Sequence, residues 1–459
     1  MSSKVTGRAP RVSAGRLYAL VSVLALLVLA LPGILSGAPM TLDDCVARAL
    51  DKNLSILEGE EVVSEAIGGI AEARSGFLPN LSLSGSYNFV EKVARFSIPD
   101  PTTGQSMDFD ADFTRDYSFQ LMLSQPLYAG GSLTGAYRIA KRSHEIAEID
   151  LLSRQADAAL AVIESFYGLL LARESVEVTR QSIEAAEEFL RVVRARYDGG
   201  EASSFEVMRA EVEVSNLQPA LIGARNAVAL SELALKNAMG VEAGSDIEFV
   251  GEFEAKAFEI DPADAVLTAL EHRPEIGMMQ TQKTIAEESI RLAKAGRYPT
   301  LSLTANYDVR ADEITLESDK MEKSYAGYLV MSFPLFDGLR TRSRISQSYS
   351  QLRQTDIAVA GLEDGIELEV RSAALVIDAA LETLKSQEKN VEMAGEGLAI
   401  ANERYLQGYA TNLEVMDAQL ALTRGRNNRI QALHDLNLAV AKAKKAMGIL
   451  LEDYKSGAR

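Results

Sequence analysis

The residues of this 459-residue sequence whose types and spacing could do chemistry are carboxylates in two matching segments. Residues 196–210 read RYDGGEASSFEVMRA and residues 404–418 read RYLQGYATNLEVMDA, with eight identities in 15 positions. Glu206 and Glu414 are equivalent in this match, and Asp417 follows shortly after. Such carboxylates can cap the first turn of a helix, or they can form a cation-favouring ring at a constriction if copies of the chain assemble around an axis. The sequence leaves both roles open.

The same two segments carry the residues that would connect one helix to the next. Gly200 and Gly408 permit the left-handed backbone that commonly ends a helix. Ser203 in the first segment, and Thr411 or Asn412 in the second, can cap the helix that follows. A turn between helices accounts for all of these residues, so a purely structural role stands beside a functional one.

The sequence gives little support for catalytic, metal-binding or cofactor-binding chemistry. The three histidines lie far apart in the chain and lack neighbouring ligand residues. Asp108, Asp110 and Asp112 imitate the start of a calcium-binding loop. Phe113 and Phe119, however, stand where such a loop carries glycine and glutamate, so we expect an acidic outer loop instead. No phosphate-binding loop, nucleophile elbow or paired-cysteine motif is present, and we predict neither an enzyme nor a bound cofactor or metal.

The N-terminus has the pattern of a secretory signal peptide. Residues 1–38 contain four basic side chains and no acid, and the apolar run Leu17–Leu31 is only 15 residues long. That length falls short of a membrane-spanning helix, although a retained membrane anchor is the alternative. Cys45, the single cysteine, does not directly follow the apolar run, so we expect no lipid anchor and no intrachain disulfide.

Composition and charge argue against two further classes of protein, disordered chains and nucleic-acid-binding proteins. With 47% hydrophobic and 24% charged residues, the chain is expected to fold. The net charge of −18 argues against a nucleic-acid partner, because phosphate binding needs a basic face. Only 12 prolines interrupt the chain, which favours long elements over many short ones.

The chain contains two copies of one unit. A shift of 220 residues aligns PNLSLSGSY at residues 79–87 with PTLSLTANY at residues 299–307, and a shift of 208 aligns the two segments above. The 12-residue difference falls in one place, which marks a surface loop. We therefore divide the chain into a signal peptide (1–38), a first repeat (39–240), a connecting segment (241–261), a second repeat (262–450) and a C-terminal tail (451–459).

Each repeat is predicted to contribute one β-hairpin, at about 80–127 and about 300–335. Apolar and polar residues alternate along both strands of the first hairpin, and less regularly along the return strand of the second. About ten residues in a tilted strand match the height of an outer-membrane apolar band, although a soluble β-sandwich would use similar hairpins.

The segments around the hairpins are predicted to be helical. Residues 133–197 and 341–405 lack proline, and their apolar residues recur at spacings of three and four, as in a coiled coil about 100 Å long. With the helices that follow, these segments extend to about 239 and 447. Shorter helices precede the hairpins at about 42–76 and 262–296, and Pro219 is expected to bend a helix.

Two hairpins per chain cannot close a barrel, so insertion in a membrane requires an oligomer. The duplicated motifs P-x-L-S-L, [QF]-P-L-[YF] and R-Y-x-x-G-x-[AS]-x-x-[FL]-E-V-M resemble those of the TolC-like outer-membrane efflux protein family, over residues 41–450. The resemblance implies an α+β membrane protein that forms a homotrimer, with a 12-stranded β-barrel in the outer membrane continued by a 12-helix coiled-coil tunnel in the periplasm. It also implies an exit duct for efflux or type I secretion, with a periplasmic adaptor protein and an inner-membrane transporter as partners.

The resemblance further assigns roles at the tip. Glu206 and Glu414 correspond to acidic gate positions, Asp417 to a second acidic position at the entrance, and Tyr405 to a gating tyrosine. The arginine that follows the tip glycine in the family is Ala410 here, so we expect an aperture that is looser or held differently.

The tip turns themselves, with Gly200, Ser203, Gly408 and Thr411, would contact the adaptor. Two other classes compete with an export duct. A structural or adhesive coiled-coil surface protein would explain the long helices but not two matched amphipathic hairpins. A soluble periplasmic enzyme would need a catalytic constellation that the sequence does not offer.

Overall fold

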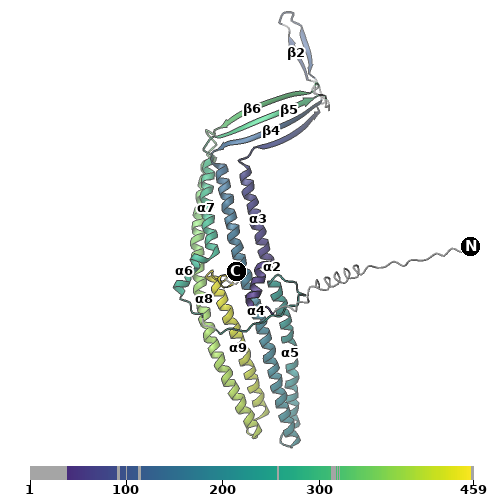
Figure 1. Ribbon diagram of the computed structural model, residues 1–459, viewed down its shortest axis with the longest axis vertical. Helices are drawn as coiled ribbons and strands as arrows, with labels where there is room; N and C mark the ends of the chain where they lie inside the picture. Colours follow the sequence, from purple (N-terminus) through teal and green to yellow (C-terminus); the bar gives the residue numbers. More distant parts are fainter. Residues whose placement is uncertain are drawn as a thin grey trace, which may run out of the picture.

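The computed structural model describes residues 39–89, 94–99, 101–111, 115–255, 258–311, 317, 319 and 321–455. The predicted signal peptide lies outside the described residues. A β-sheet stands at one end of a long body of helices, and the helices end in two neighbouring turns at the far end (Figure 1).

The sheet brings the two predicted hairpins together. It contains β1 (Asn80–Phe89), β4 (Arg115–Ala129), β5 (Thr300–Ala311) and β6 (Glu322–Ser332), all antiparallel and in the order β1-β4-β5-β6. The two hairpins therefore join through β4 and β5, which come from different repeats (Figure 1). β1 and β6 are left at the edges of the sheet.

The two faces of this sheet differ, as the alternating pattern predicts. On one face Leu83 lies opposite Leu121, and on the other Gln120 donates a hydrogen bond of 2.8 Å to the Asp308 carboxylate. The apolar face is exposed in the single chain, with Leu81, Leu83, Tyr87, Phe119, Leu121, Leu303, Tyr307, Tyr325, Leu329 and Met331 open to their surroundings. A face of this kind suits contact with lipid.

The acidic outer loop predicted around Asp108 is wrong for the part that the structure describes. Asp108 and Asp110 lie in β3 (Ser106–Ala111), which pairs with β2 (Ala94–Pro99) as a second, two-stranded sheet. The alternation of aspartates with Met107 and Phe109 is a strand pattern that the sequence interpretation missed. This small hairpin occupies the segment that is longer in the first repeat. Asp112 lies outside the described residues.

Below the sheet, each strand continues into the helices. Next to the sheet the helices pack in the order α3 (Leu54–Ser75), α4 (Ser132–Asp198), α7 (Pro274–Ala295) and α8 (Arg340–Leu406). α4 and α8 have 67 residues each and run the full length of the helical body (Figure 1). Toward the tip the order becomes α5 (Ser204–Ala238), α4, α9 (Asn412–Ala446) and α8. α5 continues through Pro219 as one helix.

The helix before each hairpin is divided in two, unlike the single helix that we predicted. α2 (Leu42–Lys52) is followed by α3, and α6 (Pro262–His272) by α7. Asn53 caps α3 by accepting a hydrogen bond of 2.9 Å from the Ser55 amide, and Pro274 begins α7 because proline has no amide hydrogen to continue the preceding helix. The last element among the described residues is a short helix, α10 (Glu452–Lys455).

A glycine that follows α5 packs against the junction between α2 and α3, and a glycine that follows α9 packs against the junction between α6 and α7. Gly240 and Gly448 have φ angles of +69° and +77°. A Cβ on Gly448 would lie 2.8 Å from the carbonyl carbon of His272, and one on Gly240 would collide with the Lys52 carbonyl. The same close contact between a glycine and a helix junction therefore occurs in the middle of both repeats.

Substituting Gly240 should weaken this joint. We expect Gly240→Ala to cost about 2–4 kcal/mol, because the left-handed backbone and the collision both oppose a Cβ. Gly244→Ala, where nothing lies within 4 Å, is the control and should melt within a degree or two of the parent protein. Thermal unfolding followed by circular dichroism measures both, and equal melting of the two variants would contradict the assignment.

The largest core lies in this middle region. Val162, Phe166 and Leu169 of α4 are buried there with Leu235 and Phe249. By length and composition α4 is the one helix among the described residues that could cross a membrane. These buried contacts identify it as a core helix instead.

Apolar residues remain exposed on the helices at the ends of the packing order. Along α8 they recur at spacings of 7, 11 and 18 residues, which return to one side of an α-helix: Ile357, Leu368, Leu375, Met393 and Ile400. On α5, exposed apolar side chains include Phe205, Met208, Val212, Ile222 and Leu230. Two uncovered apolar stripes at opposite edges indicate further helices packed against them.

Candidate functional site

The tip consists of two equivalent turns, one after α4 and one after α8. Gly200 and Gly408 have φ angles of +78° and +79°, as predicted for the residue that ends a helix. In each turn the glycine amide donates to the carbonyl three residues earlier, and the next amide donates to the carbonyl five residues earlier, at 2.8–3.0 Å. An added Cβ on Gly200 would meet nothing within 4 Å, so the turn needs glycine for its backbone conformation.

The two predicted gate glutamates complete reciprocal caps. The Glu206 amide donates to Ser203 Oγ at 3.3 Å, while Glu206 Oε2 accepts from the Ser203 amide at 2.9 Å. Thr411 and Glu414 repeat the arrangement at 3.4 and 3.1 Å. Each carboxylate uses one oxygen in its cap. The capping role left open by the sequence is therefore present in both turns.

The cap shifts the titration of Glu414. Hydrogen bonds from the backbone and hydroxyl of Thr411 lower the pKa of Glu414 below its ordinary value, and the charge of Arg404 adds to the effect. Because the folded-state pKa is lowered, the stabilisation is present above the ordinary pKa of 4.5 and is lost as the pH falls through the folded-state value.

Removing the cap should remove this pH dependence. We expect Thr411→Ala to cost about 1 kcal/mol of local stability at pH 7, and Glu414→Gln to flatten the change between pH 7 and pH 3. Hydrogen–deuterium exchange at the start of α9, with the exchange rates corrected for pH, measures both. Equal protection of parent and variants at every pH would contradict the cap.

Tyr405 lies inside the chain, between the two halves of the tip. Only 3% of it is exposed, and its ring centroid lies 5.1 Å from that of Phe189. Arg196 lies over the ring at 4.8 Å and donates through Nη1 to the Tyr405 carbonyl oxygen. Burial raises the pKa of Tyr405, the charge of Glu206 raises it further and Arg196 opposes the shift, so the phenol stays neutral. We call the contacts among Phe189, Arg196 and Tyr405 the tip latch.

Arg196 is a residue of this cluster that sequence reasoning missed. The family pattern directs attention to Ala410, two residues after Gly408, and Ala410 packs beside the apolar cluster that contains Phe189 and Tyr405. The cation comes from the opposite repeat, one turn before Gly200. The shared Arg-Tyr pair at the start of both tip segments was the available signal.

The structure brings only some of the predicted site residues together. Glu206 lies close enough to Tyr405 to shift its titration, and the Asn412 side-chain amide donates to the Glu206 carbonyl at 2.9 Å. Asp417 stands apart, exposed on α9 and without an ion pair or hydrogen bond to the described residues.

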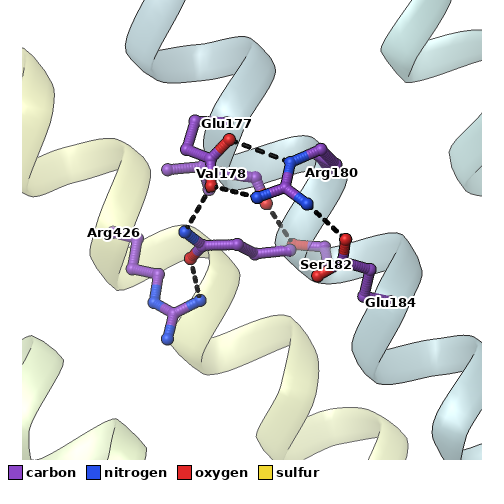
Figure 2. Close-up of polar contacts among 7 residues, drawn as sticks. Glu177, Val178, Arg180, Ser182, Glu184 and Arg426 are labelled. Atoms are coloured by element: carbon purple, nitrogen blue, oxygen red, sulfur yellow. Dashed lines mark hydrogen bonds and ion pairs between the residues drawn. The ribbon is translucent and has the colours of Figure 1, made fainter.

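A polar seam joins α4 to α9 above the tip latch. Arg426 donates to the Gln181 side chain at 2.8 Å, and the hydroxyls of Ser182 and Thr423 lie 2.8 Å apart. Figure 2 shows Arg426 reaching across to α4, beside the cluster of Glu177 and Arg180. Lower on the seam the Gln419 side chain donates to the Ala185 carbonyl at 3.3 Å.

The α4 side of this seam is itself fixed by ion pairs. Hydrogen bonds from Arg180 and Gln181 lower the pKa of Glu177 to about 2, so its carboxylate stays ionised under any physiological condition. Arg180 also pairs with Glu184, one turn further along α4 (Figure 2). Gln181 is thereby held between Glu177 and Arg426.

The family follows from a comparison of the whole sequence. The profile described as outer membrane efflux protein matches residues 45–241 and 266–449, one stretch in each repeat. The chain belongs to the outer membrane efflux protein family. This membership confirms the predicted outer-membrane location and the role in efflux.

Relatives and solved structures agree with that assignment. The outer membrane efflux protein BepC of Brucella suis is 23% identical over 90% of this chain and 86% of its own length. The cobalt-zinc-cadmium resistance protein CzcC of Cupriavidus metallidurans is also 23% identical, over 90% of this chain and 91% of its own length. The outer membrane protein VceC of Vibrio cholerae shares the fold at 18% identity with a TM-score of 0.69, over 89% of this chain and 96% of that one. CusC has a TM-score of 0.73 at 15% identity, over 89% and 92%. The predicted chain fold of two hairpins and long helices is thus confirmed.

Proposed function

We propose that three copies of this chain form an exit duct that crosses the outer membrane and extends through the periplasm. The duct is passive, and its tip opens when a periplasmic adaptor protein and an inner-membrane transporter dock. It would serve efflux or type I secretion. The observation that carries this proposal is that a single chain leaves two strands at the edges of its sheet, β1 and β6, and two uncovered apolar stripes on its helical body, on α5 and α8.

Assembly of three copies into a closed ring would pair the free sheet edges and cover the exposed helix stripes. β1 and β6 have free backbone groups along one side each, and open sheet edges are not tolerated in lipid. Three copies provide twelve strands, enough for a barrel with a wide lumen, whereas two provide only eight. The same rotation would bring α8 of one copy against α3 and α5 of the next, which covers the exposed apolar stripes.

Assembly tests the proposal directly. We expect the mature protein, extracted from outer membranes in mild detergent, to behave as a trimer that dissociates on heating. A soluble monomer after cell fractionation would overturn the proposal. A trimer that fails to conduct ions in a planar bilayer, even after the tip is opened, would favour the alternative of a structural coiled-coil protein.

The tip is proposed to select cations. Glu206, Glu414 and Asp417 would repeat three times around the axis, and the two glutamates each keep one oxygen outside their caps. We expect Asp417→Asn to lower the preference for K⁺ over Cl⁻ without lowering stability, because Asp417 has no partner in the described chain. The reversal potential across a KCl gradient measures this, and an unchanged potential would exclude Asp417 from the conducting path.

The two turns are proposed as adaptor contacts. Gly200, Ser203, Gly408 and Thr411 are all exposed at the end of the helical body, where small residues allow another backbone to approach closely. Gly199→Trp, at an exposed turn position with φ −77° where an added Cβ would make only ordinary contacts, should weaken capture of the cognate adaptor while leaving the trimer intact. Equal capture of the adaptor by the variant and the parent protein would show that the turns do not contact the adaptor.

A further inference from the structure

We propose that a basic groove on the helical body, just below the sheet, binds the phosphate headgroup of an anionic phospholipid in the periplasmic leaflet of the outer membrane. The groove lies between α3, α4 and α7 and has a volume of about 700 Å³. Four cationic side chains line it: Arg138, Lys141, Arg142 and Arg291. This inference goes beyond the exit duct, although the outward direction of the groove rests on that proposal.

The helix ends next to the sheet are basic in a chain that is acidic overall. Residues 70–78 contain one cation and one acid, residues 130–142 and 290–299 contain three cations each, and residues 337–346 contain three cations and one acid. Ten cations therefore stand against two acids at this level, whereas the whole chain has a net charge of −18. A concentration of positive charge at one level of an acidic chain indicates an anionic partner there.

Exposed aromatic residues place this level at the surface of the membrane. They lie within four residues of the strand ends that face the helices: Phe77, Tyr128, Tyr298, Phe333 and Phe336. Aromatic side chains gather where a membrane meets water. At 1.5 Å per residue, Arg138 lies about 9 Å from the first residue of α4, and Arg291 about 6 Å from the last residue of α7. Long cationic side chains at this depth extend to the lipid headgroups.

The groove lies on the side of α4 that other elements cover further down. Eighteen residues make five complete helix turns, so residues at this spacing share one side of a helix. Arg138, Lys141 and Arg142 lie 18 residues before three residues that pack in the core shared with α2: Ala156, Ala159 and Leu160. In a duct α2 must pack outside the wall, because an extra helix inside would obstruct the lumen. The groove therefore faces outward.

A buried carboxylate holds two of the four cations together. Glu288 is 7% exposed, accepts a hydrogen bond of 2.6 Å from Arg291 Nη1 and lies 3.6 Å from Arg138 Nη1. The side chains of both arginines are more than half exposed. Each guanidinium carries five N–H groups, so both retain donors for a phosphate.

The other two cations lie on the exposed surface of α4. Arg142 donates to the Glu145 carboxylate at 2.6 Å, and the Lys141 ammonium lies 5.2 Å from the centre of the Tyr137 ring. Glu145 and Glu148 follow Lys141 by about one and two turns, on the side away from the sheet. The end of the groove nearer the membrane is therefore cationic.

A phospholipid suits both surfaces at this place. Its phosphate would contact the groove, and its acyl chains would lie against the apolar face of the sheet above. A soluble anion would gain only the first of these contacts. In the second repeat the positions equivalent to the three α4 cations are uncharged, namely Ser346, Tyr349 and Ser350. Each copy therefore offers one groove of this kind, and a trimer offers three.

Native mass spectrometry of the delipidated trimer tests the site, because every bound lipid adds a resolvable mass. Dioleoyl phosphatidylglycerol is compared with dioleoyl phosphatidylethanolamine, which has the same acyl chains but no net charge. We expect up to three phosphatidylglycerol molecules per trimer, bound more tightly than phosphatidylethanolamine. Lys141→Gln with Arg142→Gln should weaken phosphatidylglycerol binding about five-fold for each lost cation, and so about 25-fold, while phosphatidylethanolamine binding changes little.

Two further variants separate charge at the groove from other effects. Lys141→Arg with Arg142→Lys keeps both charges and should bind phosphatidylglycerol within about three-fold of the parent protein. Arg48→Gln with Lys52→Gln removes the same charge from exposed positions on α2 and should bind as the parent does. The trimer itself should persist in every variant, because none of these side chains contacts Glu288.

Three results would overturn the inference. The first is equal affinity of the parent trimer for the two lipids, and the second is parent-like phosphatidylglycerol binding by the Lys141→Gln and Arg142→Gln variant. The third is displacement of the lipid by millimolar inorganic phosphate, which would indicate a site for free anions. Failure of the duct is distinguishable, because the spectra of the parent protein would then show no trimer.

Discussion

Aspartate at Leu368 or Leu375 is expected to abolish assembly of the duct and all export through it. The two leucines are 72% and 70% exposed in the single chain and lie seven residues apart on the apolar stripe of α8. In the proposed trimer this stripe is covered by the next copy. Each substitution would remove about 2 kcal/mol of apolar burial and would leave an unpaired carboxylate in the contact, which costs several kcal/mol more. Symmetry repeats that cost at three contacts.

Size-exclusion chromatography with light scattering measures this result. Leu368→Met and Leu375→Met are the matched controls, because they keep an apolar side chain of similar volume, and they should remain trimeric. The aspartate variants should keep their helical content while they lose the trimer. Stable trimers of both aspartate variants would show that the stripe is not an interface.

Arg196→Ala is expected to loosen the tip by about 2–4 kcal/mol, the combined loss of a charged hydrogen bond and a cation–π contact in a largely buried place. Because each 1.4 kcal/mol is a factor of ten, hydrogen–deuterium exchange at the ends of α4 and α8 should accelerate about 30- to 1,000-fold. Because the charge of Arg196 opposes the raised pKa of Tyr405, its removal should raise that pKa further.

Arg194→Ala, two residues away, is the matched control. Its partner Glu211 lies 2.6 Å away, but both side chains are about half exposed, so the pair is worth at most about 1 kcal/mol. Exchange in this variant should change by less than about ten-fold. Similar exchange in the Arg194 and Arg196 variants would mean that the tip latch does not hold the two halves of the tip together.

The local structure of the tip is predictable from the sequence alone. Glycine in a left-handed turn and a hydroxyl three residues before a glutamate are patterns whose partners lie within a few residues, so the caps at Ser203 and Thr411 could be predicted from spacing alone. The hairpins were predictable for the same reason, because side chains alternate along a strand whatever the strand pairs with.

Two features of the tip that sequence reasoning missed, the position of Arg196 and the burial of Tyr405, involve partners far apart in the chain. Two equal Arg-Tyr pairs begin the tip segments, and no local pattern tells which tyrosine is buried. The packing of α4 against α8 and α9 decides that Tyr405 is covered by Phe189 and Arg196, while Tyr197 remains exposed.

The repeats, hairpins, turns and caps are therefore determined by the sequence itself, because each depends on short-range spacing and on the periodicity of helix and strand. The pairing of β4 with β5, the contact of Arg196 with Tyr405, and the unequal burial of the two tyrosines are decided by the tertiary structure. They depend on how two nearly equal units pack against each other. In a duplicated chain, that packing is what makes equivalent residues differ.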